Sequence, residues 1–131
     1  MASSRTVRVV AAVVEHDGRY LITQRRPTAV LPLMWEFPGG KVEAGETDVQ
    51  ALKRELLHRL GADIECGKLI SFVSHPYEHY TVDLFLYECR LLSEKLEVRN
   101  VNAFKWVASS DFEQYPFTPA DEASMNKLLG E

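Results

Sequence analysis

Apolar residues along the chain gather in short runs of strand length and in one longer stretch with helical spacing. Runs rich in β-branched and aromatic residues predict strands at Val7 and residues 9–14, 20–22, 64–73, 80–89 and 103–107. The segment 15–19, between the first two runs, contains an Asp-Gly pair, which is typical of a tight turn. We therefore expect the chain to open with a hairpin formed by those two strands.

The stretch with helical spacing has recognisable signals at both ends. Thr47 is followed three residues later by Gln50, a pairing that predicts a capping box at the start of a helix. Gly61 stands where a left-handed C-terminal cap belongs. The apolar residues between these ends recur at helical spacing and should face the core: Val49, Leu52, Leu56 and Leu60.

Two further segments complete the predicted fold. Residues 27–45 contain three prolines and three glycines, so we expect a shaped loop there rather than a continuous element. After Thr118, a proline and a set of apolar residues predict a second amphipathic helix: Pro119, Ala123, Met125, Leu128 and Leu129. Strands interspersed with two helices predict an α/β fold, with a mixed β-sheet sandwiched between the helices.

Length and composition narrow the class of protein. A chain of 131 residues is expected to form a single domain over residues 1–131, because smaller pieces would bury too little core. Hydrophobic residues make up 46% and charged residues 26%, which is ordinary globular usage. The net charge of −4 argues against binding long nucleic acid, which requires a basic surface. A small anionic ligand held by a local site remains compatible with this charge.

Cysteine content and hydropathy indicate where the protein works. Cys66 and Cys89 provide neither a disulfide framework nor a metal-ligand set, and we expect them to be small buried hydrophobic residues in a reducing environment. The apolar run 9–14 ends at Glu15 and is too short for a membrane span or a signal-peptide core. The sequence therefore predicts a cytoplasmic protein without a membrane partner.

Candidate chemistry is concentrated in residues 40–62, GKVEAGETDVQALKRELLHRLGA. This segment resembles the Nudix box, whose pattern is Gly, five residues, Glu, seven residues, Arg-Glu-aliphatic, any residue, Glu-Glu, any residue, Gly, aliphatic. Six residues fall on that pattern: Gly40, Glu46, Arg54, Glu55, Leu56 and Gly61. His58 and Arg59 stand in place of the Glu-Glu pair, and Ala62 stands in place of the final aliphatic residue.

The resemblance extends over nearly the whole chain and is closest to the MutT type of Nudix hydrolase, which residues 35–43, WEFPGGKVE, also resemble. It implies hydrolysis of a nucleoside triphosphate to the monophosphate and pyrophosphate by metal-assisted attack of water, with Mg²⁺ or Mn²⁺. It also implies that Gly40, Glu46 and Glu55 hold the metal, and that Arg54 orients Glu46. The expected partner is a small nucleotide, and the protein is expected to be a monomer or homodimer.

His58 and Arg59 permit three interpretations. Both follow Glu55 at helical spacing, so all three side chains should point toward a common patch. In the first, His58 is a surface residue and Arg59 forms an i, i+4 ion pair with Glu55. In the second, neutral His58 joins Glu55 and either Glu46 or Glu43 around one metal, with Mn²⁺ favoured over Mg²⁺, while Arg59 contacts phosphate. In the third, the domain binds nucleotides or regulates but has lost hydrolysis.

Four residues outside the box are candidates for substrate binding by the same resemblance. Arg25 matches a position that contacts phosphate at the end of a strand, and Asp121 matches a polar residue that reads the nucleobase. Trp35 or Phe117 would stack on the base. Alternatively, Asp121 completes a helix cap with Thr118 and Phe117 belongs to the core. Another nucleoside diphosphate derivative is a further possible substrate.

Overall fold

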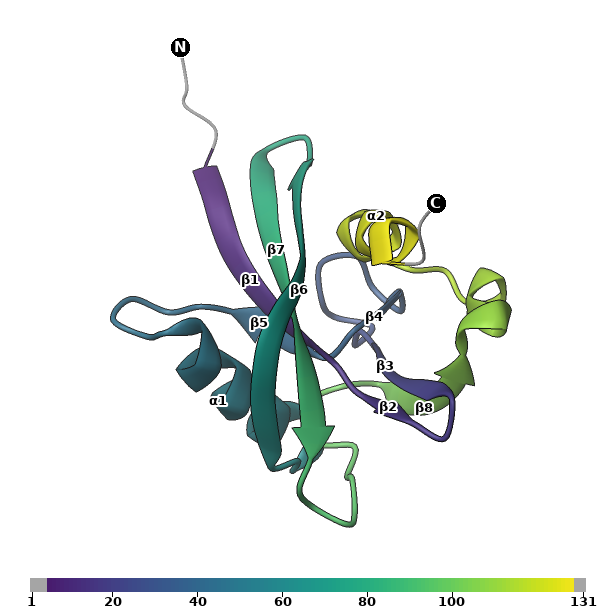
Figure 1. Ribbon diagram of the computed structural model, residues 1–131. Helices are drawn as coiled ribbons and strands as arrows, with labels where there is room; N and C mark the ends of the chain where they lie inside the picture. Colours follow the sequence, from purple (N-terminus) through teal and green to yellow (C-terminus); the bar gives the residue numbers. More distant parts are fainter. Residues whose placement is uncertain (1–4, 129–131) are drawn as a thin grey trace.

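The computed structural model describes residues 5–128, and these form one mixed sheet and one antiparallel sheet with two α-helices (Figure 1). The first sheet has the order β5-β1-β7-β6, and the second has the order β2-β3-β4 with β8 paired to β3. The strands are β1 (Arg5–Val13), β2 (Glu15–His16), β3 (Arg19–Gln24), β4 (Trp35–Glu36), β5 (Gly39–Lys41), β6 (Ile64–Pro76), β7 (Tyr80–Leu91) and β8 (Ala103–Ala108). The helices are α1 (Asp48–Leu60) and α2 (Pro119–Leu128), with a 3₁₀ segment at Ser109–Gln114.

Strand β1 is buried on both faces, which explains its continuous apolar sequence. It pairs antiparallel with β5 and parallel with β7. Val10 and Ala12 belong to one hydrophobic cluster, whereas Ala11 and Val13 belong to another on the opposite face. A strand with a parallel neighbour and two covered faces requires apolar residues at successive positions rather than at alternate ones.

The opening hairpin differs from the prediction. The tight turn is present, with Asp17 and Gly18 both in the left-handed region at φ 52° and φ 77°, as a two-residue hairpin turn requires. It joins β2 to β3, however, and β1 continues into the other sheet. The expectation that run 9–14 pairs with run 20–22 holds only at its last residue, where the Val14 carbonyl accepts from the Leu21 N–H at 3.0 Å. It is wrong for residues 9–13, which pair with β5 and β7.

Helix α1 confirms the predicted boundaries. The Thr47 side chain accepts from the Gln50 backbone, the Gln50 side chain accepts from the Thr47 backbone, and Gly61 adopts a left-handed conformation at φ 62°. Leu52, Leu56 and Leu60 are fully buried, but Val49 is 40% exposed. Including Val49 in the core stripe was therefore wrong, and the buried face of the helix begins at Ala51 and Leu52.

The remaining elements agree with the sequence in kind and differ in detail. Segment 27–45 is irregular as predicted, but it includes the two short strands β4 and β5. Helix α2 forms as predicted and packs against β6 and β7, while α1 packs on the other side against β5, β1 and β6 (Figure 1). The predicted α/β fold is thus confirmed. Leu129 lies outside the described residues, within which no helix is long and apolar enough to cross a membrane.

Candidate active site

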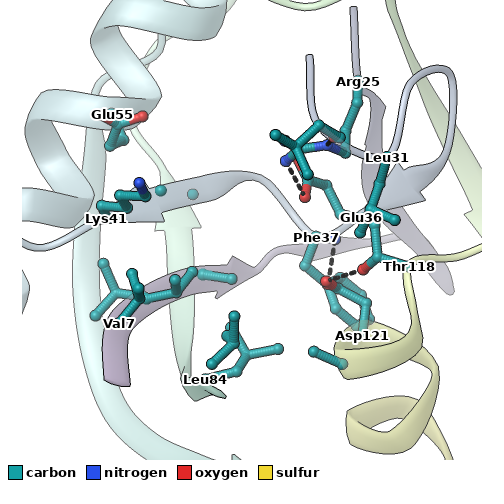
Figure 2. Close-up of a pocket in the computed structure, with 18 of the residues that line it drawn as sticks. Val7, Arg25, Leu31, Glu36, Phe37, Lys41, Glu55, Leu84, Thr118 and Asp121 are labelled. Atoms are coloured by element: carbon teal, nitrogen blue, oxygen red, sulfur yellow. Dashed lines mark hydrogen bonds and ion pairs between the residues drawn. The ribbon is translucent and has the colours of Figure 1, made fainter. Parts of the chain in front are cut away.

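A cavity of about 460 Å³ opens where β1, β5 and β7 face the segment after β3 and the start of α2. Figure 2 shows Glu55 and Lys41 on one side of it and Asp121 and Thr118 on the other. Apolar residues of β1 and β7 form the wall between them, including Val7, Val9, Val82 and Leu84. The acidic and basic residues that line the cavity come from seven places in the sequence: Arg5, Arg25, Glu36, Lys41 with Glu43, Glu55, Arg59 and Asp121.

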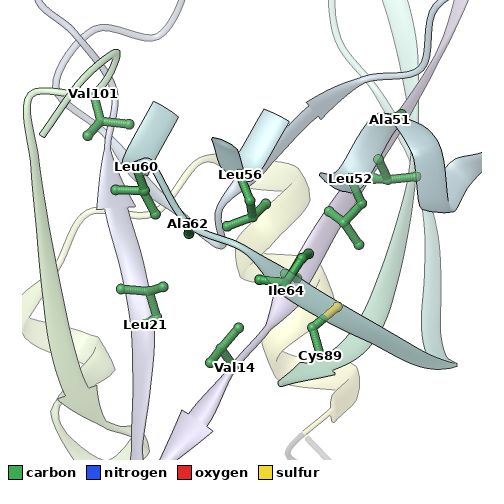
Figure 3. Packing of buried hydrophobic residues seen from close by; sticks show 12 residues of the cluster. Val14, Leu21, Ala51, Leu52, Leu56, Leu60, Ala62, Ile64, Cys89 and Val101 are labelled. Carbon is green, nitrogen blue, oxygen red and sulfur yellow. The ribbon is translucent and has the colours of Figure 1, made fainter. Parts of the chain in front are cut away.

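Packing of α1 determines where its charged residues lie. The buried face of the helix, with Leu52, Leu56 and Leu60, is inserted into a cluster with Leu21 and Ile64 (Figure 3). Each of these leucine side chains is fully excluded from solvent, and such burial contributes roughly 2 kcal/mol per side chain. Because this face is fixed, the helix cannot rotate, and the adjacent surface is held against β5 and the cavity.

Arg54 joins two glutamates at the base of this surface. Its Nε and Nη2 donate to the two carboxylate oxygens of Glu46 at 2.6 and 2.9 Å, and its Nη1 donates to Glu55 Oε1 at 2.5 Å. Nη2 also donates to the Lys41 carbonyl at 2.9 Å. The hydrogen bond from Arg54 is the main reason that the pKa of Glu46 is lowered. The predicted pairing of Arg54 with Glu46 is confirmed.

Gly40 allows the Glu55 carboxylate to lie against the backbone of β5. A Cβ atom on residue 40 would stand 2.3 Å from Oε2 of Glu55, well inside van der Waals contact. Any side chain at this position would therefore displace Glu55. The box glycine and the box glutamate, 15 positions apart in the chain, are in direct contact in the fold.

Arg59 completes the environment of Glu55, and His58 does not. Arg59 Nε donates to Glu55 Oε2 at 2.7 Å, so the predicted i, i+4 ion pair is confirmed. Both oxygens of this 7% exposed glutamate are consequently paired with arginine. His58 is exposed and its Nε2 lies 2.9 Å from Nδ2 of Asn100. The expectation of a common patch holds for Arg59 and is wrong for His58. The His58 side chain contacts Asn100, on the loop at residues 97–102, and does not line the cavity.

These side chains do not fit a divalent cation in the arrangement described. Within residues 5–128 no three His, Cys, Asp or Glu side chains stand close enough to share a metal ion. Glu46 is held by Arg54, Glu55 is held by two arginines, and His58 points elsewhere. The metal-ligand set that the sequence predicted from Gly40, Glu46, Glu55 and His58 is therefore not assembled. Glu97 is an acidic residue on the loop between β7 and β8. It is exposed and pairs with Arg99 at 3.0 Å.

Arg25 lies in the cavity, as predicted, together with a carboxylate that the sequence reading missed. Its Nη1 donates to both oxygens of Glu36 at 3.1 and 3.3 Å, and its Nε donates to the Val30 carbonyl at 2.5 Å. Burial raises the pKa of Glu36, while Arg25 and Arg59 act in the opposite direction. The available signal was a lone acid between two aromatic residues, Trp35 and Phe37, in an extended segment.

Asp121 is buried at the other end of the cavity and binds backbone from a distant segment. Its Oδ1 accepts from the Phe37 N–H at 2.9 Å, and its Oδ2 accepts from the Thr118 hydroxyl at 2.6 Å. The alternative reading of Asp121 as a helix cap is wrong in its geometry, since Thr118 donates to Asp121 and the carboxylate reaches Phe37 instead of the Thr118 backbone. Burial first, and then the charge of Glu36, raise the pKa of Asp121 to about 7.

The predicted stacking residues are located in the core. Trp35 and Phe117 are 6% and 5% exposed and form a β-bridge with each other. Both belong to the cluster on the α2 side of β1, and neither lines the cavity. Assigning base stacking to either residue was therefore wrong, because the sheet directs both side chains into the interior. Phe37 and Tyr77 are the aromatic residues near Asp121 that do line the cavity.

Substituting Asp121 with asparagine should remove a pH dependence of stability. A carboxyl whose pKa is raised on folding, here from 3.8 to about 7, stabilises the fold while it is protonated and loses that contribution as pH rises to the folded value. The wild-type free energy of unfolding should therefore fall by about 2–3 kcal/mol between pH 5 and pH 8, and that of Asp121→Asn should fall less, with the remaining slope due to Glu36, whose pKa burial also raises. Urea titrations at four pH values measure both slopes.

The same titrations contain their own check. Glu46 and Asp48 have lowered pKa values, so their contributions are lost only below their ordinary values of 4.5 and 3.8, outside the window. Asparagine can still accept from the Phe37 N–H, so the connection between α2 and the residue after β4 is retained. Equal slopes for the two proteins would show that Asp121 is ionised throughout this range.

Comparisons with known proteins place this geometry in a family context. A family model described as the NUDIX domain matches residues 9–127. A CTP pyrophosphohydrolase of Escherichia coli is 32% identical over 117 residues, covering 89% of this chain and 87% of that protein. An 8-oxo-dGTP diphosphatase of Haemophilus influenzae is 30% identical over 129 residues, covering 97% and 94%. The crystal structure of a MutT NUDIX hydrolase from Burkholderia pseudomallei superposes with a TM-score of 0.84 at 26% identity, covering 95% and 99%.

Proposed function

Because the chain belongs to the Nudix family, in its MutT-like branch of pyrophosphohydrolases, we propose that it cleaves a nucleoside triphosphate to the monophosphate and pyrophosphate. The observation that supports this proposal is a hydrogen-bonded group at the edge of the cavity. Arg54 donates to both Glu46 and Glu55, and the Glu55 carboxylate lies against Gly40. Similar proteins named for CTP and for 8-oxo-dGTP support a pyrimidine or an oxidised purine nucleotide as the substrate.

The charged lining suggests how each end of such a substrate would be held. Arg25 and Arg59 supply guanidinium groups at the cavity, and planar guanidinium forks bind phosphate through paired hydrogen bonds. Glu55 supplies the carboxylate at the reacting phosphates, and Arg54 keeps it in position from behind. Arg54 and Glu46 therefore act as positioning residues in this proposal, and Glu55 is the catalytic residue.

The nucleobase would occupy the end of the cavity near Asp121. This carboxyl lies beside the apolar wall formed by Leu84 and the aromatic ring of Phe37. A buried acceptor rejects a base that cannot donate to it, because the acceptor would then be left without a partner. We propose that Asp121 distinguishes bases by their exocyclic amino group. Its bonds to Phe37 and Thr118 fix its orientation for that purpose.

We also propose that turnover is slow, with Mg²⁺ or Mn²⁺ as the cation. The supporting observation is that Arg59 and His58 stand where the box pattern has glutamates, and that Arg59 neutralises Glu55. The same observation favours a second candidate, a nucleotide-binding or regulatory domain that does not hydrolyse its ligand. The two candidates share the cavity and differ in whether pyrophosphate is released.

Release of pyrophosphate from a panel of natural and oxidised nucleoside triphosphates, with Mg²⁺ and with Mn²⁺, tests the proposal directly. We expect measurable turnover of at least one triphosphate and a product pair of monophosphate and pyrophosphate, identified by chromatography. Nucleoside diphosphate sugars are assayed in parallel, because they represent the alternative substrates, in which a nucleoside diphosphate is linked to another group. Nucleotide-dependent thermal stabilisation without any product would instead establish the binding domain.

A further inference from the structure

Acidic and basic side chains alternate across the charged part of the cavity. Arg54 pairs with Glu55, Glu55 pairs with Arg59, and Arg25 pairs with Glu36. Arg59 is also close enough to Glu36 to act against the burial that raises the pKa of that carboxyl. Arg59 thus pairs directly with Glu55 and also acts electrostatically on Glu36. A cation is already resident at the point where a divalent ion would need free carboxylate oxygens.

The two arginines that hold Glu55 are attached very differently. Arg54 is fixed by two bonds to Glu46 and one to the Lys41 carbonyl, in addition to its bond with Glu55. Within residues 5–128, the Arg59 guanidinium hydrogen-bonds to one side chain, Glu55. A guanidinium has five N–H donors, so most of the Arg59 donors are left for another acceptor at the cavity. Arg59 is therefore the exchangeable partner of Glu55.

We propose that Arg59 keeps Glu55 closed to divalent cations in the free protein and releases it when a polyphosphate enters the cavity and takes the guanidinium. This inference rests on the proposed function, because it takes the ligand to be a nucleoside triphosphate. A polyphosphate offers Arg59 several anionic oxygens in place of the single carboxylate oxygen at 2.7 Å. Cation and nucleotide are then linked thermodynamically, and each raises the affinity of the protein for the other.

Direct titration of Mn²⁺ tests this linkage without requiring turnover. Free Mn²⁺ is followed by its electron paramagnetic resonance signal, with and without a CTP analogue whose α,β-bridging oxygen is replaced by methylene. The amount of Mn²⁺ that the analogue binds by itself is measured in a titration without protein and is subtracted from the amount bound in the presence of protein. For the wild-type protein we expect the analogue to strengthen Mn²⁺ binding by about 10- to 100-fold. For Arg59→Gln we expect tighter Mn²⁺ binding without the analogue, weaker analogue binding, and a linkage reduced to about threefold or less.

Two further variants make the test specific to Arg59. Arg90→Gln removes an exposed arginine–glutamate pair at 3.2 Å whose two residues do not line the cavity, and it should behave as wild type. Arg59→Lys retains a cation beside Glu55 and should retain part of the linkage, which also covers the case in which Arg59→Gln fails to fold. Thermal unfolding of each variant establishes that it is native before titration.

The inference is overturned if wild-type protein binds Mn²⁺ without the analogue as tightly as Arg59→Gln does. It is equally overturned if Arg59→Lys loses the linkage as completely as Arg59→Gln. Failure of the proposed function is distinguishable, since it would appear as absent pyrophosphate release in the separate turnover assay. A protein that releases pyrophosphate but binds Mn²⁺ independently of nucleotide would retain the proposed function and lose only the role of Arg59.

Discussion

Replacing Glu55 with glutamine should lower kcat for nucleoside triphosphate hydrolysis by about 10²- to 10⁴-fold, the range typical of a positioned acid–base residue. Glutamine nearly matches the size of glutamate, so no new bulk meets Gly40, but its single carbonyl oxygen can accept from either Arg54 or Arg59 and its NH₂ group then faces the other guanidinium. It lacks the negative charge, which makes it unable to take a proton or balance a cation at the reacting phosphates. Steady-state release of pyrophosphate measures the effect.

A matched substitution distinguishes this loss from a general effect of removing a glutamate. Glu65 also pairs with an arginine, Arg90, but it is exposed on β6 and outside the cavity lining. Glu65→Gln should leave kcat within about twofold of wild type, as expected for an exposed ion pair far from the reacting atoms. If Glu55→Gln were as active as Glu65→Gln, the assignment of Glu55 as the catalytic carboxylate would be wrong.

The double substitution His58→Glu, Arg59→Glu should raise kcat by about 100-fold or more, equivalent to about 2.7 kcal/mol of transition-state stabilisation. It removes the cation that pairs with Glu55 and places two carboxylates at the positions where the box pattern has them. Metal held by carboxylates stabilises developing charge by several kcal/mol. The apparent KM should rise at the same time, because Arg59 no longer contacts phosphate. Initial rates over a range of substrate and Mg²⁺ concentrations separate the two parameters.

The single substitutions divide this effect between the two positions. Arg59→Glu should account for most of it, since Arg59 lies at the cavity, while exposed His58 is directed to Asn100. His58→Glu alone should change kcat by less than about threefold. A fall in kcat for the double variant would contradict the prediction and show that His58 and Arg59 take part in the reaction as they stand.

The sequence predicted elements whose signals are local. The boundaries of α1 depend on Thr47, Gln50 and Gly61, and each of these acts on backbone groups within a few residues. Strands β6, β7 and β8 were located because β-branched and aromatic runs mark them in any context. The hairpin partner of β1 was missed, since the same apolar run fits a hairpin or a central strand, and only its distant partners β5 and β7 decide between them.

The site was predictable to a similar degree. The spacing of the box identified Glu46, Arg54 and Glu55 as a group, and about two turns of helix plus a capping loop were sufficient to bring them together. Trp35 and Phe117 were assigned to the wrong environment because aromatic residues have the same sequence signature in a core and at a binding surface. Glu36 gained significance only when folding placed Arg25 beside it and Asp121 across from it.

By itself, the sequence determined the family, the helix that carries Glu55, and the loss of two acidic residues beside it. Those properties follow from the spacing of residues along one helix and its caps, because the helical repeat fixes how residues a few positions apart lie relative to one another. Tertiary structure alone decided that His58 turns to Asn100, and that Asp121 is buried against Phe37. The physical reason is that the charge state and partners of a side chain depend on burial and on neighbours from distant segments, which spacing does not specify.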